Sequence, residues 1–462
     1  MPSHDLLVLG SGPGGYVAAI RAAQLGLNVA VIEDDVVGGR CLNYACMPAK
    51  AILHTAEVYE QAAGSGAAEL GIEIEGAKLN WAGVQVRREK ITKSLTGGVA
   101  GLFKKNKIEL IEGRGSLLAA EAGAKALRVG VGTETHEATN VILATGSVAL
   151  PIPGVEFGGR VLNTWGAWSL EELPDSMAVV GAGASGSEIA SAYARLGVKV
   201  HLIEMLPQIL PAEDKDMVRV AERAFKKQGI EIATKTKVEE VKASAKSVKL
   251  SYGETKLEVD YLVIAGGRDP DVEGLGLDAA GVKLTDQGRI EVDATQLTSV
   301  PGVYAIGDLT PGPALAHKAS DEGIVAVEAI AGLPNHPIDL GRIVGATFCE
   351  PQVASVGMTE AEAKAAGHEI KVGKFKLGGV GAAQVYDDRD GMVKIVADAT
   401  YGEILGAHVV GKTACNMIVE LVATQALEGG YQELARVIHP HPTISEAVME
   451  AARAVDGWAT HA

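Results

Sequence analysis

The chain has 462 residues, of which 47% are hydrophobic and 22% charged, and its formal net charge is −16. This length predicts three or four domains, because one hydrophobic core stops growing well below this size. The negative charge argues against a nucleic-acid partner and against an anionic membrane. No apolar run approaches the roughly 18 residues that a membrane span needs.

The N-terminus enters a strand-like apolar run at residues 5–10, with no basic segment and no small-residue cleavage site before it. We therefore expect no secretion signal and a reducing, cytoplasmic compartment. The chain has only four cysteines, and two of them lie five residues apart. A catalytic or metal-binding thiol pair is favoured over a structural disulfide on this ground.

Strand and helix patterns alternate along most of the chain, which predicts an α/β architecture with parallel sheets. One βαβ unit occurs twice, at residues 5–34 and again at 177–205. Each copy holds three glycines in a GxGxxG spacing, and an acid follows the last glycine after 18 residues in both (33−15 and 204−186). These residues are Gly10, Gly12, Gly15 and Glu33 in the first copy and Gly181, Gly183, Gly186 and Glu204 in the second.

Both motifs follow an apolar strand and open a helix, which is where a dinucleotide pyrophosphate binds. The glycines let the backbone approach the phosphates, and the acid accepts hydrogen bonds from ribose hydroxyls. The sequence therefore predicts two dinucleotide sites rather than two ordinary tight turns.

The two sites are expected to hold different dinucleotides. No Arg or Lys occurs in the six residues after Glu204, so a 2′-phosphate would meet a carboxylate and no guanidinium, and NAD is favoured over NADP. The first unit leads into the segment that holds Cys41 and Cys46. A hydride does not pass directly between a thiol pair and a nicotinamide, so an intermediate carrier is needed there. We predict FAD at the first motif and NAD at the second.

The segment GGRCLNYACMPAK (38–50) raises the question of how its two cysteines are used. Five residues along an ideal helix separate two Cα atoms by ~7.5 Å, whereas a disulfide needs them within about 7 Å. A bond between Cys41 and Cys46 therefore requires a break in the helix, and a helix that starts near Pro48 fits this requirement. Buried free thiols and a zinc pair are the alternatives. No Cys or His doublet follows at ligand spacing, so no metal site is expected.

CLNYACMPAK resembles the Cys-Leu-Asn-x-x-Cys-x-Pro-x-Lys active-site motif of the class I pyridine nucleotide–disulfide oxidoreductases. The chain is also similar to that family in the order of its features, which are an FAD fingerprint, ATG, an NAD(P) fingerprint, a GD acid and a C-terminal HP. The similarity covers essentially the whole chain. Within the family, LAHKASDEG and HPHPTISE resemble most closely the members that oxidise dihydrolipoamide.

The resemblance implies an α/β fold with two Rossmann-like dinucleotide-binding domains, for FAD and NAD, and a C-terminal α+β dimerisation domain. It also implies a homodimer in which the C-terminal segment of one subunit reaches the active site of the other. The corresponding ranges are 1–148 for the first part of the FAD-binding domain, 149–268 for the NAD-binding domain, 269–335 for a central domain that completes the FAD site, and 336–462 for the dimerisation domain.

The resemblance further implies a redox disulfide in which Cys41 meets the substrate and Cys46 faces the flavin. His441 is the implied base and Glu446 its orienting partner. A thiol substrate with a pKa near about 8.5 must become a thiolate, and a histidine bonded to a carboxylate can take that proton near neutral pH. The neighbouring His439 is expected to pack against the turn that two prolines make.

Further site residues follow from the same resemblance. Lys50 is implied near the flavin, paired with Glu188 beside the nicotinamide site, where its positive charge favours the reduced, anionic flavin. Asp308 matches the family acid that binds the ribityl chain. The remaining implied cofactor-binding residues are Gly39, Gly115, Thr145, Gly146 and Ala316 for FAD and Val238 and Gly267 for NAD.

The implied reaction is the oxidation of protein-bound dihydrolipoamide with reduction of NAD⁺. The implied partners are the lipoyl domains of a 2-oxoacid dehydrogenase or glycine-cleavage complex. The alternatives are an NAD(P)H-dependent reductase of another disulfide, such as a mycothione-like or mixed disulfide, and a flavoprotein with a structural role in an assembly. Substrate preference stays open because Arg40 stands where the family has Thr, Tyr44-Ala45 where it has Val-Gly, and Cys415-Asn416 where Gly-Glu is common.

Overall fold

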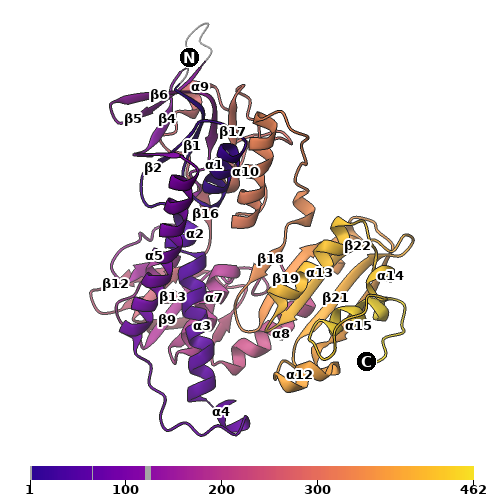
Figure 1. The fold of residues 1–462 in the computed structure, drawn as a ribbon. Coiled ribbons are helices and arrows are strands. Elements are labelled where there is room, and N and C mark those ends of the chain that lie inside the picture. The colour runs from indigo at the N-terminus through magenta and orange to yellow at the C-terminus, as the bar shows by residue number, and fades with distance from the viewer. Residues whose placement is uncertain (1–2, 65, 120–125, 462) are drawn as a thin grey trace. The chain divides into compact units, whose positions relative to one another are not determined.

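The computed structural model describes residues 3–64, 66–119 and 126–461 (Figure 1). Contacts divide the chain into two compact units. The first unit comprises residues 1–51, 82–150 and 267–340, and the second comprises 52–81, 151–266 and 341–462. The expected domain boundaries at 148, 268 and 335, and the function assigned to each range, stay predictions. Within the described ranges, no helix is long and apolar enough to cross a membrane.

The first unit is built on one large sheet with the strand order β3-β2-β1-β6-β5-β4, and β17 pairs with β6. The contacts of β1 with β2 and β6 are parallel, as a βαβ unit requires. The strands of this sheet are β1 (His4–Leu9), β2 (Val29–Glu33), β3 (Glu109–Glu112), β4 (Gly115–Leu117), β5 (Leu127–Val131), β6 (Glu134–Leu143) and β17 (Val303–Ala305). A separate ribbon pairs β7 (Ser147–Ala149) with β16 (Arg268–Pro270).

Apolar layers cover both faces of this sheet, because successive side chains of a strand point to opposite faces. Leu6 and Val8 of β1 pack with helices α1 and α10, which lie side by side (Figure 1). Leu7 and Leu9 pack in the opposite layer, with Leu275. The helical elements of this unit are α1 (Pro13–Gln24), α2 (Gly39–Asn43), α5 (Trp81–Lys105), α9 (Leu277–Ala280), η1 (Gly307–Leu309) and α10 (Ala316–Ile330).

The second unit contains a parallel sheet with the order β11-β10-β9-β15-β8 and an antiparallel meander, β12-β13-β14. The strands are β8 (Val161–Leu162), β9 (Ser176–Val180), β10 (Lys199–Ile203), β11 (Glu231–Ala233), β12 (Val238–Ala243), β13 (Val248–Tyr252), β14 (Thr255–Val259) and β15 (Tyr261–Ile264). The helices are α4 (Gly66–Glu69), α6 (Thr164–Trp168), α7 (Ala184–Arg195) and α8 (Lys215–Lys227), and α3 (Cys46–Ala63) runs into this unit from the first.

The rest of the second unit is an antiparallel sheet with the order β18-β19-β22-β21-β20. Helices α13, α14 and α15 bury an apolar core against it, which includes Ile395, Val409, Ile418 and Val448. This is the α+β region expected after residue 336. Its elements are β18 (Gly345–Thr347), β19 (Gln352–Gly357), α11 (Glu360–Ala365), β20 (Ile370–Lys376), η3 (Leu377–Gly379), α12 (Gly381–Val385), β21 (Met392–Asp398), β22 (Ile404–Gly411), α13 (Ala414–Ala426), α14 (Tyr431–Leu434) and α15 (Glu446–Val455), and η2 (Leu340–Arg342) precedes them.

Candidate active site

The duplicated glycine motifs form two turns of the same construction. A Cβ atom on Gly15 would overlap the carbonyl oxygen of Gly10, and a Cβ on Gly186 would overlap that of Gly181 in the same way. The last glycine of each motif therefore allows its helix to approach the strand end. By contrast, a Cβ on Gly12 or Gly183 would meet none of the described atoms within 4 Å, so the helix N-terminus faces open space there.

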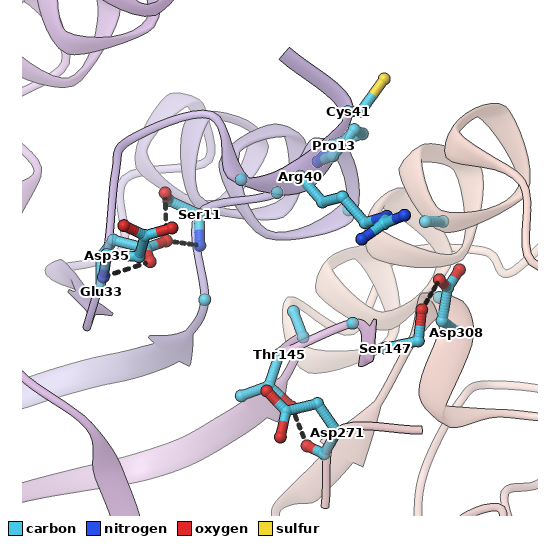
Figure 2. A pocket seen from close by; sticks show the side chains of 18 of the residues that line it. Ser11, Pro13, Glu33, Asp35, Arg40, Cys41, Thr145, Ser147, Asp271 and Asp308 are labelled. Atoms are coloured by element: carbon cyan, nitrogen blue, oxygen red, sulfur yellow. Dashed lines mark hydrogen bonds between the residues drawn. The ribbon is translucent and has the colours of Figure 1, made fainter. Parts of the chain in front are cut away.

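The two acids that follow the motifs occupy equivalent positions. Glu33 accepts hydrogen bonds from the backbone N–H groups of Ser11 (2.8 Å) and Asp35 (3.0 Å), as Figure 2 shows. Glu204 accepts hydrogen bonds from two further backbone N–H groups at the matching positions, 2.7 and 2.8 Å away. Each carboxylate thus ties the glycine turn to the end of the next strand and lies beside the N-terminus of its helix.

A cavity of about 300 Å³ opens in the first unit at the N-terminus of α1. A helix N-terminus without a side chain at Gly12, next to such a cavity, suits a pyrophosphate. The structure brings most of the predicted FAD residues to the wall of this cavity: Gly10, Gly12, Glu33, Gly39, Gly115, Thr145, Gly146, Asp308 and Ala316. Gly15 packs behind the wall against Gly10, and Lys50 stays a prediction.

Asp308 lies on the cavity wall with partners that the sequence did not reveal. Its carboxylate accepts hydrogen bonds from the Ser147 hydroxyl (2.5 Å) and from Arg268 (2.7 Å). Ser147 and Asp308 are visible together in Figure 2. Arg268 belongs to the stretch YLVIAGGRDP (261–270), in which only Gly267 was predicted to bind a cofactor. The arginine directly after the Gly-Gly pair was the available signal.

Arg114 is a second charged residue on the same wall that the sequence did not indicate. Arg114 donates to Asp271 (2.7 Å) and to Asp34 (2.9 Å), and the Thr145 hydroxyl donates to the Asp271 carbonyl oxygen (2.7 Å). The hydrogen bonds from Arg114 to Asp271 and Asp34 outweigh the effect of burial and raise the pKa of Arg114 above its usual value. This pairing connects β2, β4 and the residues after β16 at one side of the cavity.

Cys41 and Cys46 form a disulfide, and both line the cavity. Cys41 lies in α2 and Cys46 begins α3, so the helical path breaks at Tyr44-Ala45, and the two Cα atoms are 4.7 Å apart. The expected break is therefore present, although α3 starts two residues before Pro48. The Tyr44 hydroxyl donates to Asp35 (2.7 Å), and burial together with this bond raises the pKa of Tyr44.

The other two cysteines are not in a disulfide. Cys349 is buried, and its burial raises the pKa of its thiol well above the usual value. Cys415 is only partly buried. In the part of the chain that the structure describes, no group of His, Cys, Asp or Glu side chains is arranged to hold a metal ion.

Arg40, the departure beside the first cysteine, also lies on the cavity wall. Figure 2 shows its side chain extended toward the region of Ser147 and Asp308. Burial and the positive charge of Arg268 lower the pKa of Arg40 to about 10, although Asp308 opposes this effect. The guanidinium is therefore charged at neutral pH and adds a cation to the cavity.

The predicted base and its partner lie together in the second unit. His441 Nδ1 is 2.9 Å from a carboxylate oxygen of Glu446, whose other oxygen accepts the Thr443 N–H (2.9 Å). Burial opposes ionisation of Glu446, but these hydrogen bonds outweigh it and lower the pKa of Glu446. The His441 side chain is 74% exposed, whereas His439 is buried against Glu420 at 2.7 Å. The His439 side chain is therefore packed against Glu420, whereas the His441 side chain is accessible from outside the chain.

The remaining predicted residues have separate surroundings. Glu188 is buried in α7 and accepts the Phe348 N–H (2.9 Å). Its expected pairing with Lys50 stays a prediction. Val238 begins β12 and packs against the apolar core of its sheet. Gly267, expected in the NAD-binding range, belongs by its contacts to the first unit, where its carbonyl oxygen accepts the Leu150 N–H (3.1 Å). The strand pairing of β7 with β16 holds it there.

Residues 4–323 match the family described as "Pyridine nucleotide-disulphide oxidoreductase", and residues 343–452 match its dimerisation domain. A dihydrolipoyl dehydrogenase of Geobacillus stearothermophilus is 42% identical over 465 residues, which cover 99% of this chain and 97% of that protein.

Two solved structures have a similar fold. LpdA of Mycobacterium tuberculosis has a TM-score of 0.91 at 27% identity, covering 97% of this chain and 98% of that one. The HOCl-induced flavoprotein disulfide reductase RclA of Escherichia coli has a TM-score of 0.86 at 25% identity, covering 98% and 99% of the two chains. The predicted fold class, an α/β fold of this family with a C-terminal dimerisation domain, is confirmed.

Proposed function

The chain belongs to the pyridine nucleotide-disulphide oxidoreductase family, and we propose that it is a dihydrolipoyl dehydrogenase that uses FAD and NAD. The observation that carries this proposal is the Cys41–Cys46 disulfide on the wall of the cavity at the first glycine motif. The similarity of the whole chain to dihydrolipoyl dehydrogenases supports the choice of substrate.

The lining of the cavity in the first unit supports FAD as its occupant. Gly12 and the N-terminus of α1 would hold the pyrophosphate, and Asp308 would hold a hydroxyl-bearing part of the molecule. When bound, FAD would accept the electron pair of a reduced thiol pair and supply a hydride to a nicotinamide. Gly181, Gly183 and Glu204 would hold NAD in the second unit, because the turn there has the same construction.

The proposed reaction begins with a proton transfer from the substrate to the protein. His441, oriented by Glu446, takes the proton from one thiol of dihydrolipoamide. The resulting thiolate attacks the Cys41 sulfur, which forms a mixed disulfide and releases Cys46 as a thiolate. The second substrate thiol then attacks its own partner sulfur and gives its proton to the departing Cys41 sulfur, so that lipoamide leaves and Cys41 becomes a thiol, while the first proton stays on His441. The substrate loses two electrons and two protons, and the cysteine pair gains the two electrons.

We propose that the enzyme is a homodimer, since its C-terminal part matches the family's dimerisation domain. In this proposal His441 serves the cysteine pair of the partner subunit. Its exposure on the chain leaves it accessible to such a partner. The physiological substrate is a lipoyl group carried by another protein, the lipoyl domain of a 2-oxoacid dehydrogenase or glycine-cleavage complex.

A steady-state assay with free dihydrolipoamide tests the proposal. We expect turnover with NAD⁺ that exceeds turnover with NADP⁺, and a purified protein with flavin absorbance. Cys46→Ser should abolish this turnover while FAD stays bound. Normal dihydrolipoamide oxidation by Cys46→Ser would refute the assignment.

The similarity to RclA, which is a disulfide reductase by its description, supports one alternative. In that case the chain would reduce another disulfide with NADH or NADPH. Rates with mycothione-like and mixed disulfides, measured beside the lipoamide rate on the same preparation, separate the two functions. A faster rate with one of these disulfides would favour the alternative.

A further inference from the structure

Helix α10 carries a buried ion pair behind the cavity wall. Lys318 and Glu322 lie one helical turn apart, with Nζ and a carboxylate oxygen separated by 2.8 Å. Their side chains are 0% and 2% exposed. A buried ion pair is costly unless further hydrogen bonds satisfy its remaining groups, so these bonds show what the pair holds in place.

The further hydrogen bonds of the pair reach the turn η1, which follows β17. Lys318 Nζ donates to the Gly307 carbonyl oxygen (2.9 Å) and to the Thr310 hydroxyl (3.0 Å). A Glu322 carboxylate oxygen accepts the Gly307 N–H (2.6 Å). Both polar groups of Gly307 are therefore bonded to side chains from a single helix.

Gly307 is the residue at which the chain turns into Asp308. Its φ of +72° lies in the left-handed region, and a Cβ there would approach the Ala319 Cβ of α10 at 3.1 Å. Because a peptide group is planar, fixing the Gly307 carbonyl also fixes the direction of the next N–H and the start of Asp308. The pair thus constrains the backbone from which the Asp308 carboxylate reaches the cavity wall.

We infer that Lys318 and Glu322 are positioning residues for the FAD site, acting through the Gly307–Asp308 turn. They hold Asp308 where Ser147 and Arg268 can share its carboxylate and where FAD can meet it. This inference rests on the proposed function, since it takes FAD as the molecule that fills the cavity. It gives the stretch LAHKASDEG a role in cofactor binding beyond that of Ala316.

The same helix offers a matched control. Glu328 of α10 pairs with Arg21 of α1 at 2.6 Å, and this pair ties the two helices together. Loss of the Glu328 pair should disturb helix packing without reaching the turn. A role of Lys318 and Glu322 in helix stability alone would give both sets of variants the same behaviour.

The test variant is the double substitution Lys318→Met/Glu322→Gln, which leaves no unpaired charge in the core. Thr310→Val is a milder second variant, because it removes one partner of Lys318 within the turn. Glu328→Gln is the control. FAD affinity is measured by titrating FAD into each apoprotein, and the flavin midpoint potential is measured on each reconstituted protein. Circular dichroism and thermal unfolding establish that each variant is folded.

We expect the double variant to bind FAD about 10- to 100-fold more weakly and to shift the flavin potential, because Asp308 loses its fixed position. Thr310→Val should change both quantities in the same direction by less, and Glu328→Gln should stay within about twofold of the wild type. Each substitution is also made together with Asp308→Asn. If the pair acts through Asp308, its effect on FAD affinity should largely disappear in that background.

Two results would overturn the inference. One is a folded double variant whose FAD affinity and flavin potential equal those of the wild type. The other is an effect of the pair that simply adds to that of Asp308→Asn. A wild-type apoprotein that binds no FAD would instead refute the proposed function, so the two failures are distinguishable.

Discussion

At the scale of single residues, Arg40 and Tyr44 change the surroundings of the cysteine pair. Both lie on the cavity wall, and Tyr44 is bonded to Asp35, two residues after the acid of the first motif. The Tyr44 side chain therefore connects the cysteine segment to the dinucleotide turn. Arg40 brings a positive charge into the same cavity, where a pyrophosphate would carry two negative charges.

Arg40→Thr tests the contribution of this charge. We expect FAD to bind about tenfold more weakly, since a hydrogen bond to a charged group contributes about 1.5–3 kcal/mol. The affinity should also depend less on salt, because an ionic attraction that salt screens has been removed. Titration of the apoprotein with FAD at low and high salt measures both effects. An unchanged affinity and salt dependence would place the Arg40 charge outside the FAD site.

At the scale of elements, different glycines of the second motif serve packing and ligand binding. Gly186 is required by packing, since its Cβ would overlap the Gly181 carbonyl oxygen, whereas Gly183 faces open space. The same substitution at the two positions should therefore have different consequences.

Gly186→Ala should lower the free energy of unfolding by about 1–3 kcal/mol, which is typical of an overpacked site. Gly183→Ala should cost less than about 1 kcal/mol of stability, because alanine is only a poorer N-cap than glycine. It should nevertheless weaken NAD binding, as its methyl group occupies the space next to the helix N-terminus. Thermal unfolding and NAD⁺ titration of both variants check these expectations. Equal losses of stability in the two variants would contradict the packing argument.

A second element-scale feature joins α8, α11 and β21 in the second unit. Lys394 of β21 is 0% exposed and lies 2.8–2.9 Å from carboxylate oxygens of Asp214, Asp216 and Glu360. Burial raises the pKa of Asp216, but hydrogen bonds from Lys374 and Lys394 outweigh it and lower this pKa to about 2. Hydrogen bonds from lysines lower the pKa of Glu360 to about 2 as well.

Because these pKa values are lowered, the free energy of unfolding depends on pH in the acid range. The carboxylates stabilise the fold fully above their ordinary pKa values of 3.8 and 4.5, and the contribution is lost as the pH falls toward 2. Lys394→Met should cost about 3–5 kcal/mol at neutral pH, since it leaves buried carboxylates without their cation. It should also move acid unfolding to a higher pH.

Lys364→Met is the control for Lys394→Met, because Lys364 also pairs with Glu360 but is 61% exposed. An exposed pair of this kind contributes at most about 1 kcal/mol, so its loss should have little effect. Urea unfolding at several pH values measures both variants. Equal stability of the two variants at neutral pH would show that burial of the lysine is unimportant.

At the scale of the whole molecule, the proposed dimer would place the exposed residue Ile438 and the nearby His441 at the subunit interface. Ile438 is 95% exposed in the single chain, three residues before the proposed base. A symmetric dimer would bury this segment and bring each His441 to its partner. The matching dimerisation domain supports the dimer itself.

Complementation between inactive chains tests whether the site is shared. His441→Gln should lower turnover about 10²–10⁴-fold through loss of the base, and Cys46→Ser should abolish it. Mixed dimers of the two variants would contain one intact site, made of the cysteines of one chain and the histidine of the other. Because random exchange makes roughly half of the dimers mixed, about a quarter of wild-type turnover should return. Recovery of no activity after verified subunit exchange would mean that each chain uses its own histidine.

The sequence by itself determined the features that depend on local spacing. Gly10, Gly15 and Glu33 could be found because a turn between a strand and a helix has a fixed length, and the second copy repeats it. The separation of Cys41 and Cys46 predicted a break in the helix, because helical rise per residue is constant. His441 and Glu446 are likewise close in the chain, and they are bonded in the structure.

Only the tertiary structure decided which distant residues surround the cavity. Arg114, Arg268 and Asp271 line the same cavity as the first glycine turn, although they lie more than 70 residues from it in the chain, because sheet pairing and the β7–β16 ribbon bring those segments together. Gly267 belongs to the first unit for the same reason. The Lys318–Glu322 pair reads locally as an ordinary helical ion pair, and its role becomes visible only where α10 packs against the turn after β17. Spacing along the chain encodes contacts within one element and its neighbours, whereas contacts between segments far apart depend on how the whole sheet pairs.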